Sequence, residues 1–111
     1  MSSGNTVVVE FSIIPIGSSE TSLSEYVARA CKAVKGSGVK YQLTPMGTVF
    51  EAGSIERALE VIKSAHDAVL EAGAMRVLTC VRIDDRRDKK RSMEDKVRAV
   101  EEKLSRQDLL Q

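Results

Sequence analysis

The sequence predicts an α+β fold in which four strands and two crossover helices follow the order βαββαβ, with one further helix at the C-terminus. Two observations predict it. Apolar and polar residues alternate in four short runs, as in β-strands, and apolar residues recur every three or four positions in three longer runs, as in amphipathic helices. Split βαβ units of this order form the ferredoxin-like sandwich. Without a linker, repeat or low-complexity segment, residues 1–111 are expected to form a single domain.

The first half of the chain provides a strand, a helix and a second strand. The strand is expected over residues 6–14, before a Pro and Gly pair that ends it. Thr21 or Ser22 is placed to cap the helix, and the sequence GSG at 36–38 ends it. The second strand is expected over residues 39–44, where apolar and polar residues alternate.

The second half repeats this arrangement after a tight turn. The turn is PMG at 45–47, and the third strand follows over residues 48–52. Ser54 is expected to cap a long helix that Gly73 ends. A fourth strand over 76–83 leads through a charged segment to a last helix. The apolar stripe of that helix comprises Met93, Val97, Val100 and Leu104.

The composition is that of an ordinary globular domain and argues against several classes of function. Hydrophobic residues make up 42% of the chain, and 17 basic against 16 acidic residues give a net charge of +1. This balance does not favour a partner such as nucleic acid or a membrane surface, and no apolar run approaches the roughly 20 residues of a membrane helix. The polar N-terminus lacks a secretory leader pattern. The two cysteines lie far apart without disulfide or metal spacing, so we expect a cytoplasmic protein.

The expected sheet has one face under the two crossover helices and one face without a cover. The apolar faces of strands one, two and four are expected to build the core, whereas strand three is ambiguous because either of its faces suits the core. The uncovered face would carry Val8, Glu10, Ser12, Lys40, Gln42, Thr44, Leu78, Cys80 and Arg82. Since this surface mixes apolar and polar groups, we expect a second copy to cover it, in a homodimer or a larger homo-oligomer of dimers.

Charged residues in two places have both a structural and a functional interpretation. Glu10 and Arg82 fall on neighbouring strands, and form either a cross-strand ion pair or a contact to a ligand. The basic run at 86–91 resembles a nucleic-acid site, but residues 84–111 hold nine basic and eight acidic residues, with no aromatic residue for base stacking. A solvated, ion-paired segment that fixes the last helix is the favoured reading.

No motif for catalysis is found. The sequence lacks a P-loop, a dinucleotide-binding glycine motif and a nucleophile elbow. His66, the only histidine, lies on the apolar stripe of the second helix without an acid or thiol at ligand spacing. A satisfied structural histidine is favoured there over a general base. We therefore expect a protein that is not an enzyme and holds no metal or cofactor.

Hydroxyl groups around the first loop and the PMGT turn are more numerous than local structure requires. Capping one helix needs only one or two of the hydroxyls in the sequence SSETSLS at 18–24. In this fold the first loop and the start of strand three lie near one another. Hydroxyl, amide and backbone groups read the donor and acceptor edges of small heterocycles. The two segments are therefore either structural or part of a small-molecule pocket.

Four segments form a specific combination. They are IPIGSSETSLSEYVA, VKYQLTPMGTVFEAGS, SAHDAVLEAGAMRVLTCVRIDDRRDK and SMEDKVRAVEEKL. Together, from Val7 to about Leu104, they resemble the small thiamine-binding, YkoF-like proteins. The resemblance implies a ferredoxin-like fold, face-to-face dimers that pair into tetramers, and non-catalytic binding of thiamine or its hydroxymethylpyrimidine precursor in salvage, transport or sensing.

The resemblance also implies a set of ligand-binding residues. Thr48 and Glu51 are expected to satisfy the ring nitrogen and exocyclic amine of an aminopyrimidine, and Pro45, Met46 and Phe50 to contact the ring. The full set is Ser22, Ser24, Tyr26, Met46, Gly47, Thr48, Phe50 and Glu51. The alternative function is an oligomeric structural or interaction protein that has no small-molecule ligand.

Overall fold

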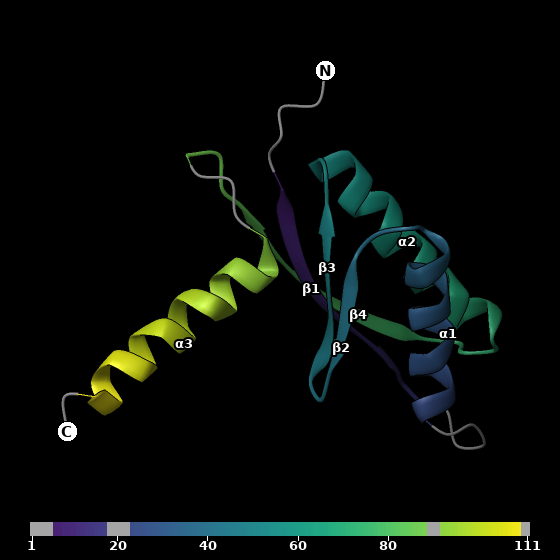
Figure 1. The fold of residues 1–111 in the computed structure, drawn as a ribbon. Coiled ribbons are helices and arrows are strands. Elements are labelled where there is room, and N and C mark those ends of the chain that lie inside the picture. The colour runs from purple at the N-terminus through teal and green to yellow at the C-terminus, as the bar shows by residue number, and fades with distance from the viewer. Residues whose placement is uncertain (1–5, 18–22, 89–91, 110–111) are drawn as a thin grey trace.

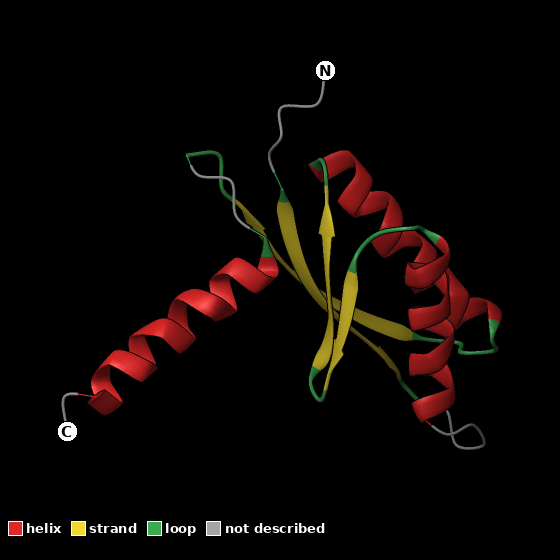
Figure 2. Cartoon of the chain, viewed as in Figure 1, coloured by secondary structure: helices red, strands yellow, loops and turns green. Residues whose placement is uncertain are grey.

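The computed structural model describes residues 6–17, 23–88 and 92–109 and has the predicted order of elements (Figures 1 and 2). In chain order these are β1 (Val7–Pro15), α1 (Leu23–Gly36), β2 (Tyr41–Thr44), β3 (Gly47–Ala52), α2 (Ile55–Glu71), β4 (Val77–Asp85) and α3 (Met93–Leu109). Figure 1 shows α1 and α2 together on one side of the sheet, with α3 on the other side and pointing away from it. The ferredoxin-like sandwich with an additional C-terminal helix is confirmed.

The sheet is antiparallel throughout and has the strand order β2-β3-β1-β4. The central strand β1 pairs with β3 only over Val7–Phe11, but with β4 over its full length of nine residues. β1 therefore extends past the start of β3. This difference in paired length positions the site described below.

The core lies between the two helices and the two central strands. Every second residue of β1 is buried against the helices, and the register aligns these residues with Thr48, Phe50 and Ala52 of β3. The Phe11 and Phe50 rings meet edge to face with centroids 5.9 Å apart, a favourable aromatic geometry. The ambiguity of strand three is thereby resolved, because Thr48 and Phe50 face the helices.

The two edge strands contribute less to the core than the sequence predicts. Tyr41 and Leu43 on β2, and Val81 and Ile83 on β4, belong to the helix-facing side by register but remain exposed. The prediction that the apolar faces of strands two and four build the core is wrong for these residues. The buried helix residues pack over the central strands, where a side chain has neighbours on both sides, and an edge strand lacks a neighbour on one side.

Helix ends follow the predicted caps where the structure describes them. The Ser54 hydroxyl accepts the backbone N–H of Arg57 at 3.1 Å. Ser92 and Asp95 cap α3 reciprocally: the Asp95 N–H donates to the Ser92 hydroxyl and the Ser92 N–H to the Asp95 carboxylate, each at 3.1 Å. The expected caps of α1, Thr21 and Ser22, lie outside the described residues.

Only the first turn of α3 docks on the sheet. Met93 is buried, but Val97, Val100 and Leu104 are exposed, so most of the predicted apolar stripe has no cover within the described chain. Between the end of β4 and the first turns of α3, Arg86 pairs with Asp88, Arg87 with Asp85, and Lys96 with Asp84. These pairs support the ion-paired reading of the part of the basic run that the structure describes.

A cavity between the hairpin and α1 as candidate functional site

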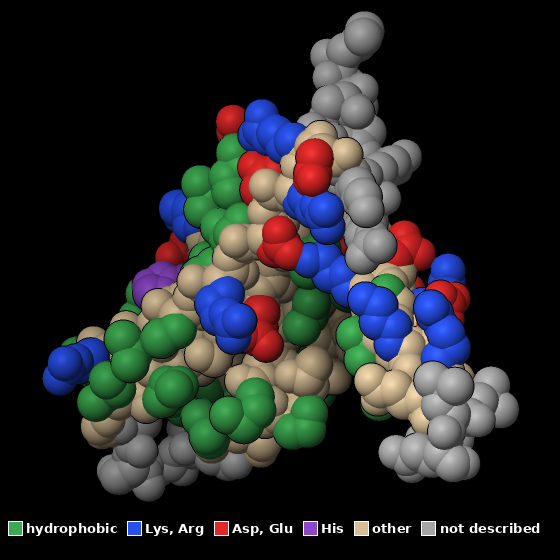
Figure 3. Space-filling view, turned by 90° about the vertical axis from the view of Figure 1, so that its left-hand side faces the viewer, with side chains coloured by type: hydrophobic (Ala, Val, Ile, Leu, Met, Phe, Trp, Pro, Cys, Tyr) green, Lys and Arg blue, Asp and Glu red, His purple; other side chains and the backbone are tan. Residues whose placement is uncertain are grey.

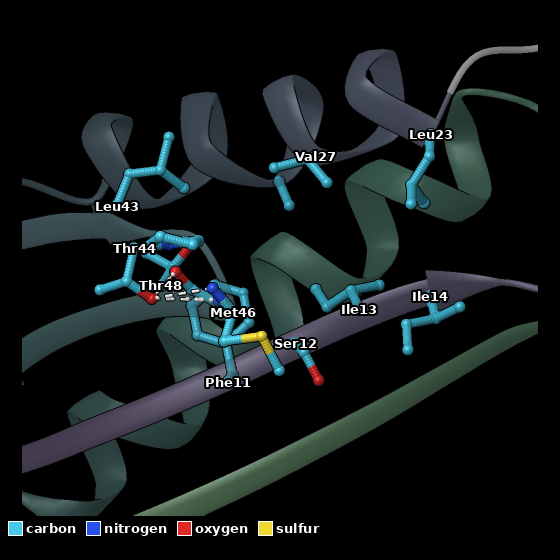
Figure 4. Close-up of a pocket in the computed structure, with 13 residues that line it drawn as sticks. Phe11, Ser12, Ile13, Ile14, Leu23, Val27, Leu43, Thr44, Met46 and Thr48 are labelled. Atoms are coloured by element: carbon cyan, nitrogen blue, oxygen red, sulfur yellow. Dashed lines mark hydrogen bonds between the residues drawn. The ribbon is translucent and has the colours of Figure 1, made fainter.

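The candidate site is the gap beside β1 where β1 runs past β3. Beyond Phe11, β1 keeps β4 as its only sheet neighbour, because β3 starts at Gly47 and the chain turns back into β2. The first half of α1 covers the gap from above, and the β2–β3 hairpin closes one side (Figure 4). The unequal lengths of the paired strands therefore create a hollow at this end of the core.

The hollow is a cavity of about 370 Å³ with mostly apolar walls. Figure 4 shows Leu23 and Val27 on α1 above Ile13 and Ile14 on β1, with Met46 at the hairpin. Its volume falls within the roughly 300–1,000 Å³ of typical small-molecule sites. A space of this size and lining suits a small ring with few polar groups.

The Thr44 hydroxyl makes three hydrogen bonds within the hairpin turn. Thr44 Oγ1 accepts the backbone N–H groups of Met46 and Gly47, at 3.3 and 3.1 Å, and donates to the Gly47 carbonyl oxygen at 2.9 Å. These bonds use its one donor and both acceptor positions. The Thr44 hydroxyl is therefore committed to the turn, although the residue lines the cavity.

Gly47 lets the hairpin lie directly against β1. A Cβ atom at this position would come within 2.6 Å of the Phe11 carbonyl oxygen, closer than van der Waals contact allows. Gly47 is required for this close approach and not for an unusual backbone conformation, since its φ is not positive. The glycine thus sets the distance between the turn and the strand that frames the cavity.

Thr48 places a hydroxyl in the wall of the cavity. Its residue is only 4% exposed, and its Oγ1 lies 3.6 Å from Cys31 Sγ on α1. A hydroxyl-to-thiol contact of this length is a weak hydrogen bond. Thr48 is therefore a hydrogen-bonding group at the inner end of a largely apolar cavity, where a buried bond to a ligand would be well shielded from water.

The structure brings part of the predicted site together. Met46, Gly47 and Thr48 all line the cavity, and Ser24 lines an adjoining hollow with Cys31. The predicted residue Ser22 lies outside the described residues.

Two predicted residues lie in the core instead of the cavity wall. Tyr26 and Phe50 are buried and belong to the main hydrophobic cluster. Phe50 packs against Phe11, which itself lines the cavity. Their contribution to a site is therefore to support its walls.

Glu51 does not join Thr48. The two residues lie on opposite faces of β3, because consecutive strand residues point to alternate sides. On the open face, Glu51 accepts the Met93 N–H at 3.3 Å and pairs with Lys40 at 3.4 Å, and Lys40 also pairs with Glu94. The prediction that Thr48 and Glu51 contact the same aminopyrimidine does not hold within one protomer, because Glu51 lies on the opposite face of β3 and anchors α3.

We call the residues Lys40, Glu51 and Glu94, together with the Met93 N–H, the α3 anchor. Its contacts shift the pKa values of two exposed members. The hydrogen bond to Glu94 is the main cause of a raised pKa at Lys40, and the same bond lowers the pKa of Glu94.

Several lining residues were not predicted as site residues. They are apolar and come from three elements: Phe11, Ile13, Ile14, Leu23, Val27 and Leu43. The sequence does indicate that Leu23 and Val27 share one helix face and that Leu43 precedes the turn. It does not indicate that β1 extends beyond β3, and this extension is the reason why Ile13 and Ile14 line the cavity.

The other chemical groups have structural partners. Glu10 and Arg82 are cross-strand partners, and their side chains lie 3.5 Å apart within one chain. His66 Nδ1 lies 2.6 Å from the Thr79 hydroxyl. In both cases the structural reading is supported. Among the described residues, no group of three His, Cys, Asp or Glu side chains is placed to hold a metal ion, and no helix is long and apolar enough to cross a membrane.

Comparisons with known proteins agree on one family. The sequence profile of a family described as thiamine-binding protein matches residues 9–101. A UPF0045 protein of Methanothermobacter thermautotrophicus is 47% identical over 98 residues, covering 88% of this chain and 99% of its own.

Solved structures share the fold over most of the chain. The hypothetical protein MJ1052 of Methanocaldococcus jannaschii has a TM-score of 0.78 and 37% identity, covering 87% of this chain and 97% of its own. A Thermotoga maritima protein, assigned provisionally to thiamine biosynthesis or salvage, has a TM-score of 0.71 and 24% identity, covering 86% of this chain and 98% of its own. From the profile match and the close relatives together, the chain belongs to the thiamine-binding protein family.

Proposed function

We propose that this protein binds thiamine or a hydroxymethylpyrimidine precursor in the cavity beside β1 and catalyses no reaction on it. The observation that carries the proposal is the buried Thr48 hydroxyl at the end of an apolar cavity of about 370 Å³. The family's name supports a thiamine-related ligand. Such a binder would serve thiamine salvage, transport or sensing in the cytoplasm.

The aminopyrimidine ring fits this arrangement chemically. A flat heteroaromatic ring presents apolar faces and a polar edge, so the walls from α1 and β1 would contact the faces while Thr48 meets a ring nitrogen or the exocyclic amine. Met46 and Pro45 lie at the hairpin, where they would contact the ring from the side. Ser24, in the adjoining hollow, would lie beside the ring's substituents.

The absence of catalysis in this proposal follows from the lining. None of the thirteen described residues that line the cavity carries a carboxylate, imidazole, amine or thiol, and the Cys31 thiol in the adjoining hollow contacts the Thr48 hydroxyl, so no lining side chain is suited to general acid or base catalysis. Hydroxyl groups without such a partner serve to bind and orient the ligand. The protein is therefore proposed as a carrier or sensor.

We further propose that the protein is a homodimer through the open sheet face and that dimers pair into a tetramer. Figure 3 shows hydrophobic side chains gathered along the lower part of the open side of the molecule, below a band of mixed acidic and basic groups. Ile14 and Leu78 are exposed large hydrophobics of this face, and Val100 on α3 is exposed too. Burial against an identical surface would remove these side chains from water.

Calorimetric titration of the purified protein with thiamine, and separately with hydroxymethylpyrimidine, tests the proposal. The expected result is saturable binding with a Kd of about 1 μM or lower, equivalent to about −8 kcal/mol or stronger. Binding of both compounds with equal affinity would identify the pyrimidine half as the recognised part. Flat titrations with both would favour the alternative, an oligomeric interaction protein whose exposed apolar residues serve assembly alone.

A further inference from the structure

The described walls of the cavity carry no charge of either sign. All thirteen residues that line it are apolar, hydroxyl-bearing or glycine. The charged residues on the neighbouring strands are engaged on the open face: Glu10 pairs with Arg82, and Glu51 pairs with Lys40. A ligand in the cavity therefore meets no cation that would neutralise an anionic group.

The N-terminus of α1 lies beside the cavity and is a feature that attracts anions in general. Its first residue, Leu23, lines the cavity, and helix N-termini carry a partial positive charge. Glu25 in the first turn already places a carboxylate at this end. The five preceding residues, SSETS, contain no lysine or arginine. The helix end thus already carries negative charge, and no lysine or arginine is among the described residues that line the cavity beside it.

We infer that the cavity selects the unphosphorylated form of its ligand and rejects the phosphate esters of the same ring. This inference rests on the proposed function and specifies its ligand class. A phosphate carries one to two negative charges, and moving it from water to an apolar wall without arginine, lysine or metal is strongly unfavourable. The free alcohol keeps the same ring contacts and loses far less hydration.

Titration with four probes tests the inference: hydroxymethylpyrimidine, hydroxymethylpyrimidine phosphate, thiamine and thiamine diphosphate. Each phosphate ester is expected to bind at least about tenfold more weakly than its parent alcohol. Binding of the alcohols should also change little with salt, because no exposed charge pair forms. Phosphate esters that bind as well as the alcohols, or better, would overturn the inference and leave the proposed function standing. If none of the four binds, the proposed function fails and the inference with it.

A charge-introducing variant gives a second, independent measurement. Met46 is 84% exposed at the edge of the cavity, so Met46→Lys places a cation there without disturbing the core. It is expected to narrow the gap between phosphate ester and alcohol by about fivefold or more. The matched control is Met75→Lys, since Met75 is 93% exposed and does not line the cavity. An unchanged ratio of affinities in Met46→Lys, or an equal change in both variants, would count against the cavity as the place where the phosphate is rejected.

Discussion

The carboxylate of Glu51 accepts a hydrogen bond from the backbone N–H of Met93, at 3.3 Å, across 42 positions of the chain. The acceptor is on a central strand and the donor is the first residue of α3. A helix N-terminus carries unsatisfied N–H groups and partial positive charge, so a carboxylate there satisfies both. One acidic side chain of the sheet therefore helps to fix where the last helix begins.

Removing the charge of Glu51 should weaken the contact between β3 and the first turn of α3. Glu51→Gln is expected to lower the free energy of local opening of the first turn of α3 by about 1.5–3 kcal/mol, since hydrogen bonds to charged groups contribute about that much. Amide hydrogen exchange at the start of α3 measures it. Glu102→Gln, on the exposed part of α3, is the control. Equal exchange in both variants would show that α3 is held by other contacts.

The stabilisation of α3 by the Lys40–Glu94 pair of the α3 anchor should depend on pH at both the acidic and the basic end of the scale. The pKa of Glu94 is lowered in the folded protein, so its contribution is present above its ordinary pKa and is lost as the pH falls through the lowered value. The pKa of Lys40 is raised, so its contribution is lost only as the pH rises through the raised value. The backbone amide resonances around Met93 should therefore shift on titration from neutral pH to about pH 3.

The control for this titration is a second exposed ion pair. Lys40→Met should move the midpoint of this shift to higher pH, because the hydrogen bond that lowers the pKa of Glu94 is lost. Lys63→Met, which removes the pair of Lys63 with Asp67 on α2, should leave the midpoint unchanged. Identical titration curves for Lys40→Met and the unmodified protein would exclude the lysine from the anchor.

Gly47 should tolerate no side chain. Gly47→Ala places a Cβ atom 2.6 Å from the Phe11 carbonyl oxygen, and relieving such a clash by backbone shifts typically costs about 1–3 kcal/mol. Urea denaturation measures the loss. Gly53→Ala is the matched control, because a Cβ there meets no atom within 4 Å and its φ is not positive. Equal stability of the two variants would mean that the hairpin can move away from β1 freely.

Replacing the hydroxyl of Thr48 tests its role in binding. Thr48→Val keeps a similar shape and is expected to weaken ligand binding by about 1 kcal/mol, or about fivefold, which is the net worth of a typical hydrogen bond. Thermal denaturation should change little, since the contact that is lost to Cys31 is long. The control is Thr6→Val, outside the cavity. Unaltered affinity would remove Thr48 from the site.

The proposed dimer makes a prediction about mass in solution. Leu78→Asp, on the open face, is expected to shift the oligomer toward the monomer in sedimentation equilibrium, because a charge would be buried in the contact. Leu59→Asp, on α2, is matched in exposure: Leu59 is 54% exposed and Leu78 is 49% exposed. Dissociation in the α2 variant alone would place the contact on the helical side.

Periodicity was sufficient to predict the fold, because each strand and helix has its own repeat of apolar residues. The β1 side of the core, Val7 to Ile13, follows from alternation alone. Alternation does not reveal how far a neighbouring element covers a strand, which is why Leu43 and Val81 were expected in the core and are exposed.

The site was predicted less completely than the fold. Met46, Gly47 and Thr48 were found through local turn chemistry and family resemblance, and they do lie together. The resemblance places Glu51 in the same set, because a carboxylate suits the exocyclic amine of an aminopyrimidine. Strand geometry sends it to the other face, where it meets a helix from much later in the chain. Such long-range neighbours are a property of the tertiary structure and leave no local signal.

The overhang of β1 beyond β3 also separates two ways of redesigning this protein. Side-chain changes in the walls alter which molecule is preferred, and change the volume only by the difference between two side chains, because the space exists where a strand is missing. Lengthening β2 and β3 by two residues each would advance the turn by about 7 Å and fill that space with backbone, while the helices and their buried contacts stay in place. Chemical preference can thus be varied by substitution, whereas insertion removes the capacity to hold a ligand.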